Sequence, residues 1–314
     1  MNSLQPLAEA PERSRRSALL TALGFRRHNV RPVPWLLALP GLAALIAFHF
    51  VPIGFGAYYA FTSWNGLTHA AWVGLRNFRD IAQDATARGA LFHTLELAGC
   101  FVVAANAIGL ALALGLNSAL KTRHLLRSLF FAPVAISPVA IGYLWSWIFD
   151  YEGALNRLLG DVGLSSLKRV WLGDPSTALW TALVVMVWQF SGLAMVLYLA
   201  GLQGISEEIY EATLVDGASP WFRFRKVVLP LLAPAFTVSA TITLVIGMRA
   251  FDQIKALTDG GPAGATETLA TQVYRQISLG RYGYGSAFAL LLAGLDATEA
   301  LLQLALLRRN EERL

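Results

Sequence analysis

The sequence predicts an all-α membrane protein that crosses the bilayer several times. Of its 314 residues, 55% are hydrophobic and only 14% are charged, whereas soluble proteins carry about 25% charged residues. The charged residues are concentrated between long apolar runs. As helices rising about 1.5 Å per residue, these runs are long enough to cross a hydrocarbon core of about 30 Å.

Six such runs are present, and each predicts one transmembrane helix. They cover approximately residues 34–62, 91–118, 128–149, 177–202, 231–254 and 284–307. Prolines inside them, such as Pro133 and Pro138, are tolerated because neighbouring helices satisfy the freed backbone groups. We therefore expect a transmembrane domain over residues 34–307, preceded by a basic tail at 1–33 and followed by a short tail at 308–314.

The distribution of Lys and Arg predicts the orientation. Six lie in the N-terminal tail, and three each in the segment Asn117–Arg127, in the loop 203–230 and at the C-terminus, fifteen in all, against nine in the other three loops. Basic residues favour the cytoplasmic side, so both termini and the loop 203–230 are expected there. Topology therefore explains the net charge of +5, and no nucleic-acid partner is expected.

The loop 203–230, which we call the elbow, has the pattern of two short helices joined by a tight bend. Ser206 is expected to cap the first helix, Gly217 to end it in the left-handed conformation, and Ser219-Pro220 to start the second. Small residues at the bend would let another protein approach the backbone, although an ordinary interfacial loop is the alternative. The residues expected to form the contact surface and the bend are Glu207, Glu208, Glu211, Ala212, Asp216, Gly217 and Ala218.

Motifs for catalysis or metal binding are missing from the sequence. The glycine-rich stretch 260–266 lacks the lysine of a phosphate-binding loop, and the five histidines are scattered without metal-ligand spacing. The single cysteine, Cys100, has no partner for an intrachain disulfide. We therefore expect a non-catalytic chain without a cofactor or metal of its own.

The elbow resembles the EAA signature of the permease subunits of binding-protein-dependent ABC importers. The matching segments are Glu211-Ala212-Thr213, Asp216-Gly217-Ala218 and Val227–Pro230, with Thr213 and Val227 replacing the usual Ala and Ile by residues of similar size. Further segments resemble the carbohydrate-type branch, which includes the maltose importer. These are Trp72–Ile81, Leu126–Asp150, Tyr198–Tyr210 and Phe251–Gln276.

This resemblance implies a type I permease bundle of six helices in a bacterial cytoplasmic (inner) membrane. The chain would pair with a second, homologous permease, and an extracytoplasmic solute-binding protein would deliver a sugar-like substrate. Two cytoplasmic ATPase subunits would hold ATP and Mg. The elbow would be the coupling helix seated on an ATPase, with Glu211 making a charged contact.

Polar and aromatic residues inside the predicted spans are candidates for the substrate path, because sugars are bound by aromatic faces and hydrogen-bonding side chains. Such residues also pack helix bundles, and this alternative stays open. The candidates are Asn106, Tyr143, Trp145, Trp188, Gln189, Ser191, Asp252, Asp296 and Glu299. The solute could be a neutral sugar, a polyol, a glycerol phosphate or an acidic oligosaccharide.

The last span carries a polar stripe that departs from the family pattern. Asp296, Glu299 and Gln303 follow one another at helical spacing, and we expect them to face the translocation cavity or the partner permease, since lipid exposure is costly. Arg249 and Asp252 lie one turn apart and are expected to pair; the alternative is that the fifth span ends close to them and both lie near the outer interface.

Two other functional classes compete with the permease. An ion-gradient-driven secondary transporter would use Asp296 and Glu299 at the membrane midplane, but it leaves the elbow unexplained. A membrane-embedded enzyme would need a nucleophile–base pair or a metal set, and the sequence shows neither.

Overall fold

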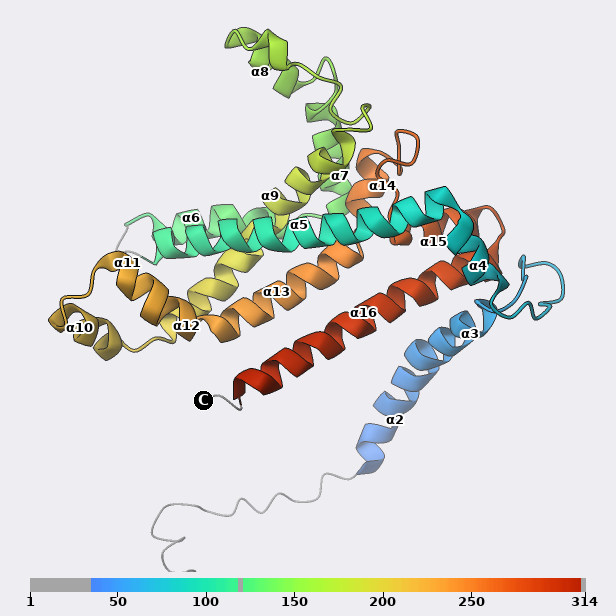
Figure 1. Ribbon diagram of the computed structural model, residues 1–314, viewed down its shortest axis with the longest axis horizontal. Helices are drawn as coiled ribbons and strands as arrows, with labels where there is room; N and C mark the ends of the chain where they lie inside the picture. Colours follow the sequence, from blue (N-terminus) through green and yellow to red (C-terminus); the bar gives the residue numbers. More distant parts are fainter. Residues whose placement is uncertain (1–34, 118–120, 312–314) are drawn as a thin grey trace, which may run out of the picture. The chain divides into compact units, whose positions relative to one another are not determined.

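The computed structural model describes residues 35–117 and 121–311, with side chains described for 37–117 and 121–303 (Figure 1). The predicted tail at 1–33 lies outside the described residues. Within these ranges the regular structure is helical, apart from one isolated antiparallel bridge between Thr62 and Trp72. The all-α prediction is confirmed for this part of the chain.

The helices follow the predicted spans, with several additional short elements between them. They are α2 (Trp35–Leu45), α3 (Val51–Tyr59), α4 (Arg76–Gln83), α5 (Ala85–Leu116), α6 (Arg123–Phe131), α7 (Pro138–Ile148), α8 (Ala154–Asp161), α9 (Ala178–Gln203), α10 (Glu207–Val215), α11 (Pro220–Arg223), α12 (Leu229–Leu231), α13 (Ala233–Met248), α14 (Asp252–Leu257), α15 (Leu269–Ser278) and α16 (Tyr282–Glu311). Short π-helical segments join α2 to α3 and α11 to α12. The chain divides into two units, one ending at Ile53 and one beginning at Gly54.

Four continuous helices in the described ranges are long and apolar enough to cross a membrane, and two bent helix pairs bring this number to six if each counts as one span. The continuous ones are Leu37–Tyr59, Ala85–Leu116, Ala178–Gln203 and Tyr282–Gln303. The bent pairs fall where the third and fifth spans are predicted.

The predicted span 128–149 is not one continuous helix. The segment Arg123–Ala135 meets Pro138–Ile148 at an angle of 98°, because Ile136 and Ser137 are extended, with ψ of 139° and 131°. A residue that precedes proline is driven out of the helical conformation, and Pro138 starts the new helix instead. At 11 residues, α7 alone rises only about 16 Å.

The predicted span 231–254 is also divided. Its helix, α13, ends at Met248, and Asp252 begins the separate helix α14. At the other end, Pro230 lies within the segment Pro220–Leu231, which is bent by 66° against α13. Pro234, near the start of α13, lacks the N–H that would continue the preceding helix.

The core of the second unit is built on the packing of α5, α9 and α13. One apolar cluster includes Phe101 and Met186, and a second includes Tyr198, all of them buried. Small residues allow the close approach of these helices: a Cβ at Gly109 on α5 would lie 2.5 Å from the Cβ of Ala194 on α9. Close contact through small residues is the usual way in which membrane helices pack.

We predict that Gly192→Ala destabilises the fold and that Gly99→Ala does not. A Cβ at Gly192 would overlap the backbone carbonyl of Phe130 in α6, whereas a Cβ at Gly99 on α5 meets no atom within 4 Å. Overpacking of this kind costs about 1–3 kcal/mol. Thermal unfolding of the purified chain in detergent measures the difference, and an equal midpoint for the two variants contradicts the prediction.

Candidate functional site

The elbow contains the two predicted helices, α10 and α11. Glu207 and Glu208 occupy the first turn of α10, where the helix dipole favours negative charge. Ser206 stands at the N-cap position, but its side chain accepts no hydrogen bond there, so its predicted capping role is corrected. Ser219 does cap α11, because its Oγ accepts a hydrogen bond from the Phe222 N–H at 3.3 Å.

The bend between the two helices is a Schellman motif. Gly217 has a φ of 68°, in the left-handed region that glycine adopts without steric cost. The N–H of Gly217 donates to the carbonyl of Leu214, and the N–H of Ala218 donates to that of Thr213, both at 3.1 Å. These two bonds satisfy carbonyls that the end of α10 would otherwise leave free. The predicted role of Gly217 in the bend is confirmed.

The outer surface of the elbow combines acidic and apolar side chains. Helix α10 has no buried residue, and Glu207, Glu208 and Glu211 form no ion pair with any residue that the structure describes. Large apolar side chains are exposed beside them, including Val215 at 88% and Trp221 at 67%. Exposed apolar patches rimmed by polar groups mark sites of protein contact.

The inner side of the elbow is braced against the bundle. Tyr210 packs on the cluster that contains Tyr198 of α9. The Arg223 guanidinium of α11 lies 5.9 Å from the centre of the Tyr210 ring, which ties α11 to α10. The elbow therefore extends from the ends of α9 and α12 (Figure 1) on a packed base.

Among the candidate residues of the substrate path, Asn106 and Gln189 are buried and bonded within the chain. The Asn106 amide donates to Thr243 Oγ1 at 2.9 Å, and its oxygen accepts from the Tyr198 hydroxyl at 2.9 Å, which joins α5, α13 and α9. The Gln189 amide donates to the Ile136 carbonyl at 3.2 Å, at the bend before α7. The Gln253 amide donates to the Gln189 oxygen at 3.0 Å.

The other candidates on α7 and α9 differ in exposure. Trp145 packs against Phe149 and Trp188, with ring centres 5.1 and 5.2 Å apart. Ser191 is buried, while Trp188 and Tyr143 are exposed. Tyr143 lines a cavity of about 550 Å³.

The polar stripe of α16 contacts α13 of the same chain. Arg249 pairs with Asp296, not with Asp252: its Nε and Nη2 each lie 2.8 Å from Asp296 Oδ2. The predicted pairing of Arg249 with Asp252 is therefore wrong, because the break after Met248 places these two residues on either side of a turn. 

Further along the stripe, the Gln303 amide donates to Glu299 Oε1 at 2.7 Å, and the Thr241 hydroxyl of α13 donates to the Gln303 oxygen, also at 2.7 Å. Together with the Arg249–Asp296 pair, these bonds connect α16 to α13 at two levels. The Thr241–Gln303 bond places polar side chains of α13 and α16 in direct contact.

Sequence reasoning missed several residues that the structure brings into these sites. Thr243, Gln253 and Tyr198 complete the hydrogen bonds of Asn106 and Gln189, although nothing in their spacing identifies them. Trp147 and Tyr151 follow Tyr143 at intervals of four residues and line the same cavity. That spacing was a usable signal. No group of three or more His, Cys, Asp or Glu residues in the described ranges could hold a metal ion.

Comparison with known proteins identifies the family. Residues 105–310 match the family described as binding-protein-dependent transport system inner membrane component. The chain is 33% identical to the probable starch degradation products transport system permease protein AmyD of Thermoanaerobacterium thermosulfurigenes, over 88% of this chain and 94% of the relative. It is 33% identical to the trehalose/maltose transport system permease protein MalF of Thermococcus litoralis, over 82% and 87% respectively.

A solved structure has the same fold. A chain of a bacterial ABC transporter involved in the import of the acidic polysaccharide alginate superposes with a TM-score of 0.76 at 22% identity, covering 95% of this chain and 99% of that one. The chain therefore belongs to the family of binding-protein-dependent transport system inner membrane components, the permeases of ABC importers.

Proposed function

We propose that this permease forms half of the translocation pathway for a sugar or related polyhydroxylated solute in an ATP-driven importer, and that it couples to a separate ATPase through the elbow. The observation that carries the coupling proposal is the geometry of the elbow: an exposed acidic and apolar face on a braced, sharply bent support. The solute class is supported by the relatives, whose names refer to starch degradation products, to trehalose and maltose, and to multiple sugars.

Coupling requires that a force on α10 reaches the membrane helices. The Schellman bend fixes the angle between α10 and α11, and the cation–π contact of Arg223 with Tyr210 holds the two helices together. The buried cluster of Tyr198, Leu202, Val228 and Leu232 then joins the elbow to α9 and to the start of α13. Since packed cores move as units, displacement of α10 would carry both membrane helices with it.

The remaining parts of the machine follow from this proposal. A second, homologous permease would complete the pathway, two ATPase subunits would bind ATP and Mg on the cytoplasmic side, and an extracytoplasmic solute-binding protein would deliver the solute. Each bent helix pair would count as one of six spans, and both termini would lie in the cytoplasm with the elbow. This chain would hold no cofactor and catalyse no reaction.

The substrate path would run along the exposed candidates and not along the buried ones. Asn106 and Gln189 already use their amide groups within the bundle. Buried polar groups that lose their partners cost about 1–3 kcal/mol, so these two residues would act as interhelical links. Tyr143 and Trp188 keep exposed aromatic faces for the solute.

We predict that Gly217→Val uncouples ATP hydrolysis from uptake, whereas Gly217→Asn retains most of the coupling. A β-branched residue is strained at a φ of 68°, but Asn tolerates this region. The complete importer, with both permeases, the ATPases and the binding protein in proteoliposomes, allows ATP hydrolysis and sugar uptake to be measured together.

The expected result for Gly217→Val is at least a tenfold lower ratio of solute transported to ATP hydrolysed, with normal membrane insertion. A residue with a Cβ in the left-handed conformation costs about 1–2 kcal/mol of conformational free energy. This cost is the physical basis of the tenfold figure. Wild-type uptake by Gly217→Val contradicts the coupling role. Absence of ATP-dependent sugar uptake in the wild-type complex contradicts the proposed function as a whole.

A second prediction separates this function from an ion-gradient-driven transporter. In the same proteoliposomes, sugar uptake should require ATP and persist when ionophores dissipate the proton and sodium gradients. Glu299→Gln should keep at least half of the uptake, because the amide oxygen still accepts the hydrogen bond from Gln303. Uptake that follows the gradient, and that Glu299→Gln abolishes, would support the secondary transporter instead.

A further inference from the structure

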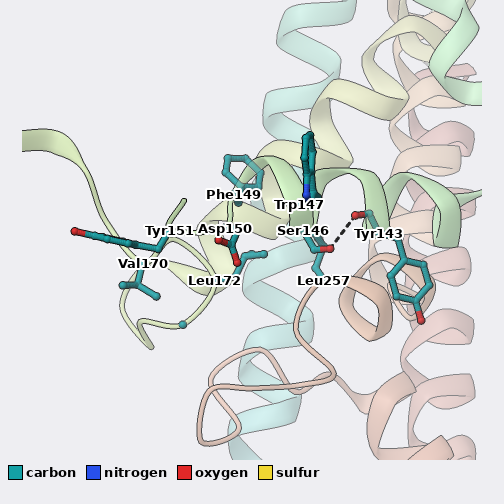
Figure 2. Close-up of a pocket in the computed structure, with 10 residues that line it drawn as sticks. Tyr143, Ser146, Trp147, Phe149, Asp150, Tyr151, Val170, Leu172 and Leu257 are labelled. Atoms are coloured by element: carbon teal, nitrogen blue, oxygen red, sulfur yellow. Dashed lines mark hydrogen bonds between the residues drawn. The ribbon is translucent and has the colours of Figure 1, made fainter. Parts of the chain in front are cut away.

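Three aromatic side chains project from α7 and from the turn that follows it. Tyr143, Trp147 and Tyr151 are spaced by four residues, and all are exposed, Trp147 to 73%. In Figure 2, Tyr143 and Tyr151 lie on either side of Trp147. The large indole surface of Trp147 is thus free to contact a ligand.

Two cavities share the side of α7 that carries Trp147. Trp147 and Asp150 line both of them: one of about 550 Å³, which also contains Tyr143 and Tyr151, and one of about 450 Å³, which also contains Arg157. Both volumes fall within the range of about 300–1,000 Å³ that is usual for small-ligand sites. Since Trp147 and Asp150 line both cavities, a ligand longer than one ring could contact the indole from both of them.

Asp150 adds a hydrogen-bonding group beside the aromatic faces. Its Oδ1 accepts the N–H of Glu152 at 2.9 Å, and its backbone carbonyl accepts the N–H of Gly153, also at 2.9 Å. These bonds fix the turn after α7 and so hold the carboxylate next to Trp147. Its second oxygen accepts no hydrogen bond from any residue that the structure describes.

We propose that Tyr143, Trp147, Asp150 and Tyr151 form a binding subsite for a neutral oligosaccharide, which we call the aromatic shelf. The C–H face of a sugar ring would pack on the indole, while neighbouring hydroxyl groups would donate to the free oxygen of Asp150, a charge-assisted bond stronger than a neutral one. The shelf rests on the proposed function, since it assumes a polyhydroxylated solute, and it narrows the class of that solute.

The charges around the shelf favour a neutral sugar over an acidic one. Asp150, Glu152 and Asp161 face the two cavities, against the single guanidinium of Arg157. A uronate or a sugar phosphate would be repelled by this excess of carboxylates, whereas uncharged hydroxyl groups would not. Among the neutral and acidic solutes that the sequence leaves open, the shelf therefore favours the neutral ones.

A membrane-interface belt is the competing explanation for exposed Trp and Tyr residues. A belt needs amphipathic rings at the level of the lipid headgroups, but it does not need a fixed carboxylate or two cavities that are lined by the same indole. The two explanations also differ in what replaces Trp147: a sugar site needs an aromatic face, so Phe should substitute for Trp and Leu should not.

The test uses the complete importer in lipid nanodiscs without its solute-binding protein. Radiolabelled maltotriose, xylotriose, trehalose and trigalacturonate are the probes, and the Kd of each is measured for the wild type and for Trp147→Ala, Trp147→Leu, Trp147→Phe and Asp150→Asn. Trp180→Ala is the matched control, because Trp180 is an exposed tryptophan on α9 that lines neither cavity. Size-exclusion chromatography checks the assembly of every variant.

The wild type should bind at least one neutral sugar and bind trigalacturonate at least tenfold more weakly. Trp147→Ala and Trp147→Leu should raise the Kd of the neutral sugar about tenfold, and Trp147→Phe less than threefold. Asp150→Asn should raise the Kd of the neutral sugar about fivefold. It should also reduce the ratio between the Kd of trigalacturonate and the Kd of the neutral sugar. Trp180→Ala should bind like the wild type.

Three results would overturn the shelf. The wild type binds no neutral sugar, Trp147→Ala binds it with the same Kd as the wild type, or Trp147→Phe and Trp147→Ala raise its Kd equally. ATP-dependent uptake of the same sugars through the binding protein is measured separately. If the wild type imports a sugar while the shelf variants match it, the shelf is wrong and the proposed function stands. If the wild type imports none of the probes, the proposed function fails as well.

Discussion

A hydrogen bond from Gln189 to the carbonyl of Ile136 is the interaction on which the rest of the bundle depends. In the hydrocarbon core no water can satisfy a free carbonyl, and each unsatisfied group costs several kcal/mol. The 98° bend between α6 and α7 frees the Ile136 carbonyl, and the amide from the middle of α9 reaches it. Because Gln253 of α14 binds the same glutamine, three segments meet at one side chain.

The other contacts of α9 follow the same rule of polar groups paired across close helices. Asn106 joins α5 to α9 and α13 through Tyr198 and Thr243, and Gly192 lets the backbone of α6 come against α9. Away from this packed centre, the elbow and the aromatic shelf are exposed. The molecule thus combines a bonded interior with two surfaces whose side chains keep free donors, acceptors and apolar faces.

The helical class and most of the spans could be predicted from the sequence because long apolar runs leave few alternatives in a membrane. The breaks in the third and fifth spans were harder to predict. Pro133 and Pro138 signal a break, but prolines are also tolerated in continuous membrane helices, and only the tertiary partner Gln189 shows which outcome holds. The end of α13 at Met248 was missed for a similar reason, since the apolar run that predicts the span 231–254 includes both Arg249 and Asp252.

The parts of the site that depend on residues close together in the sequence could be predicted. The parts that depend on contacts between distant helices could not. The elbow depends on neighbours in sequence, so Gly217, Ser219 and Pro220 were sufficient to predict its bend. The partner of Arg249 lies 47 residues away on α16, and pairing over that distance depends on how α13 and α16 are placed. Hydropathy identifies the helix but does not show which neighbouring helix a polar side chain contacts.

The bond at Ile136 also has a consequence for the order of biogenesis. Its donor lies 53 residues downstream, so the bent pair α6–α7 is synthesised before the helix that supplies the donor. Until α9 packs against the bend, the Ile136 carbonyl lacks this donor. The bend before α7 is therefore complete only after α9 has been made and has packed against it.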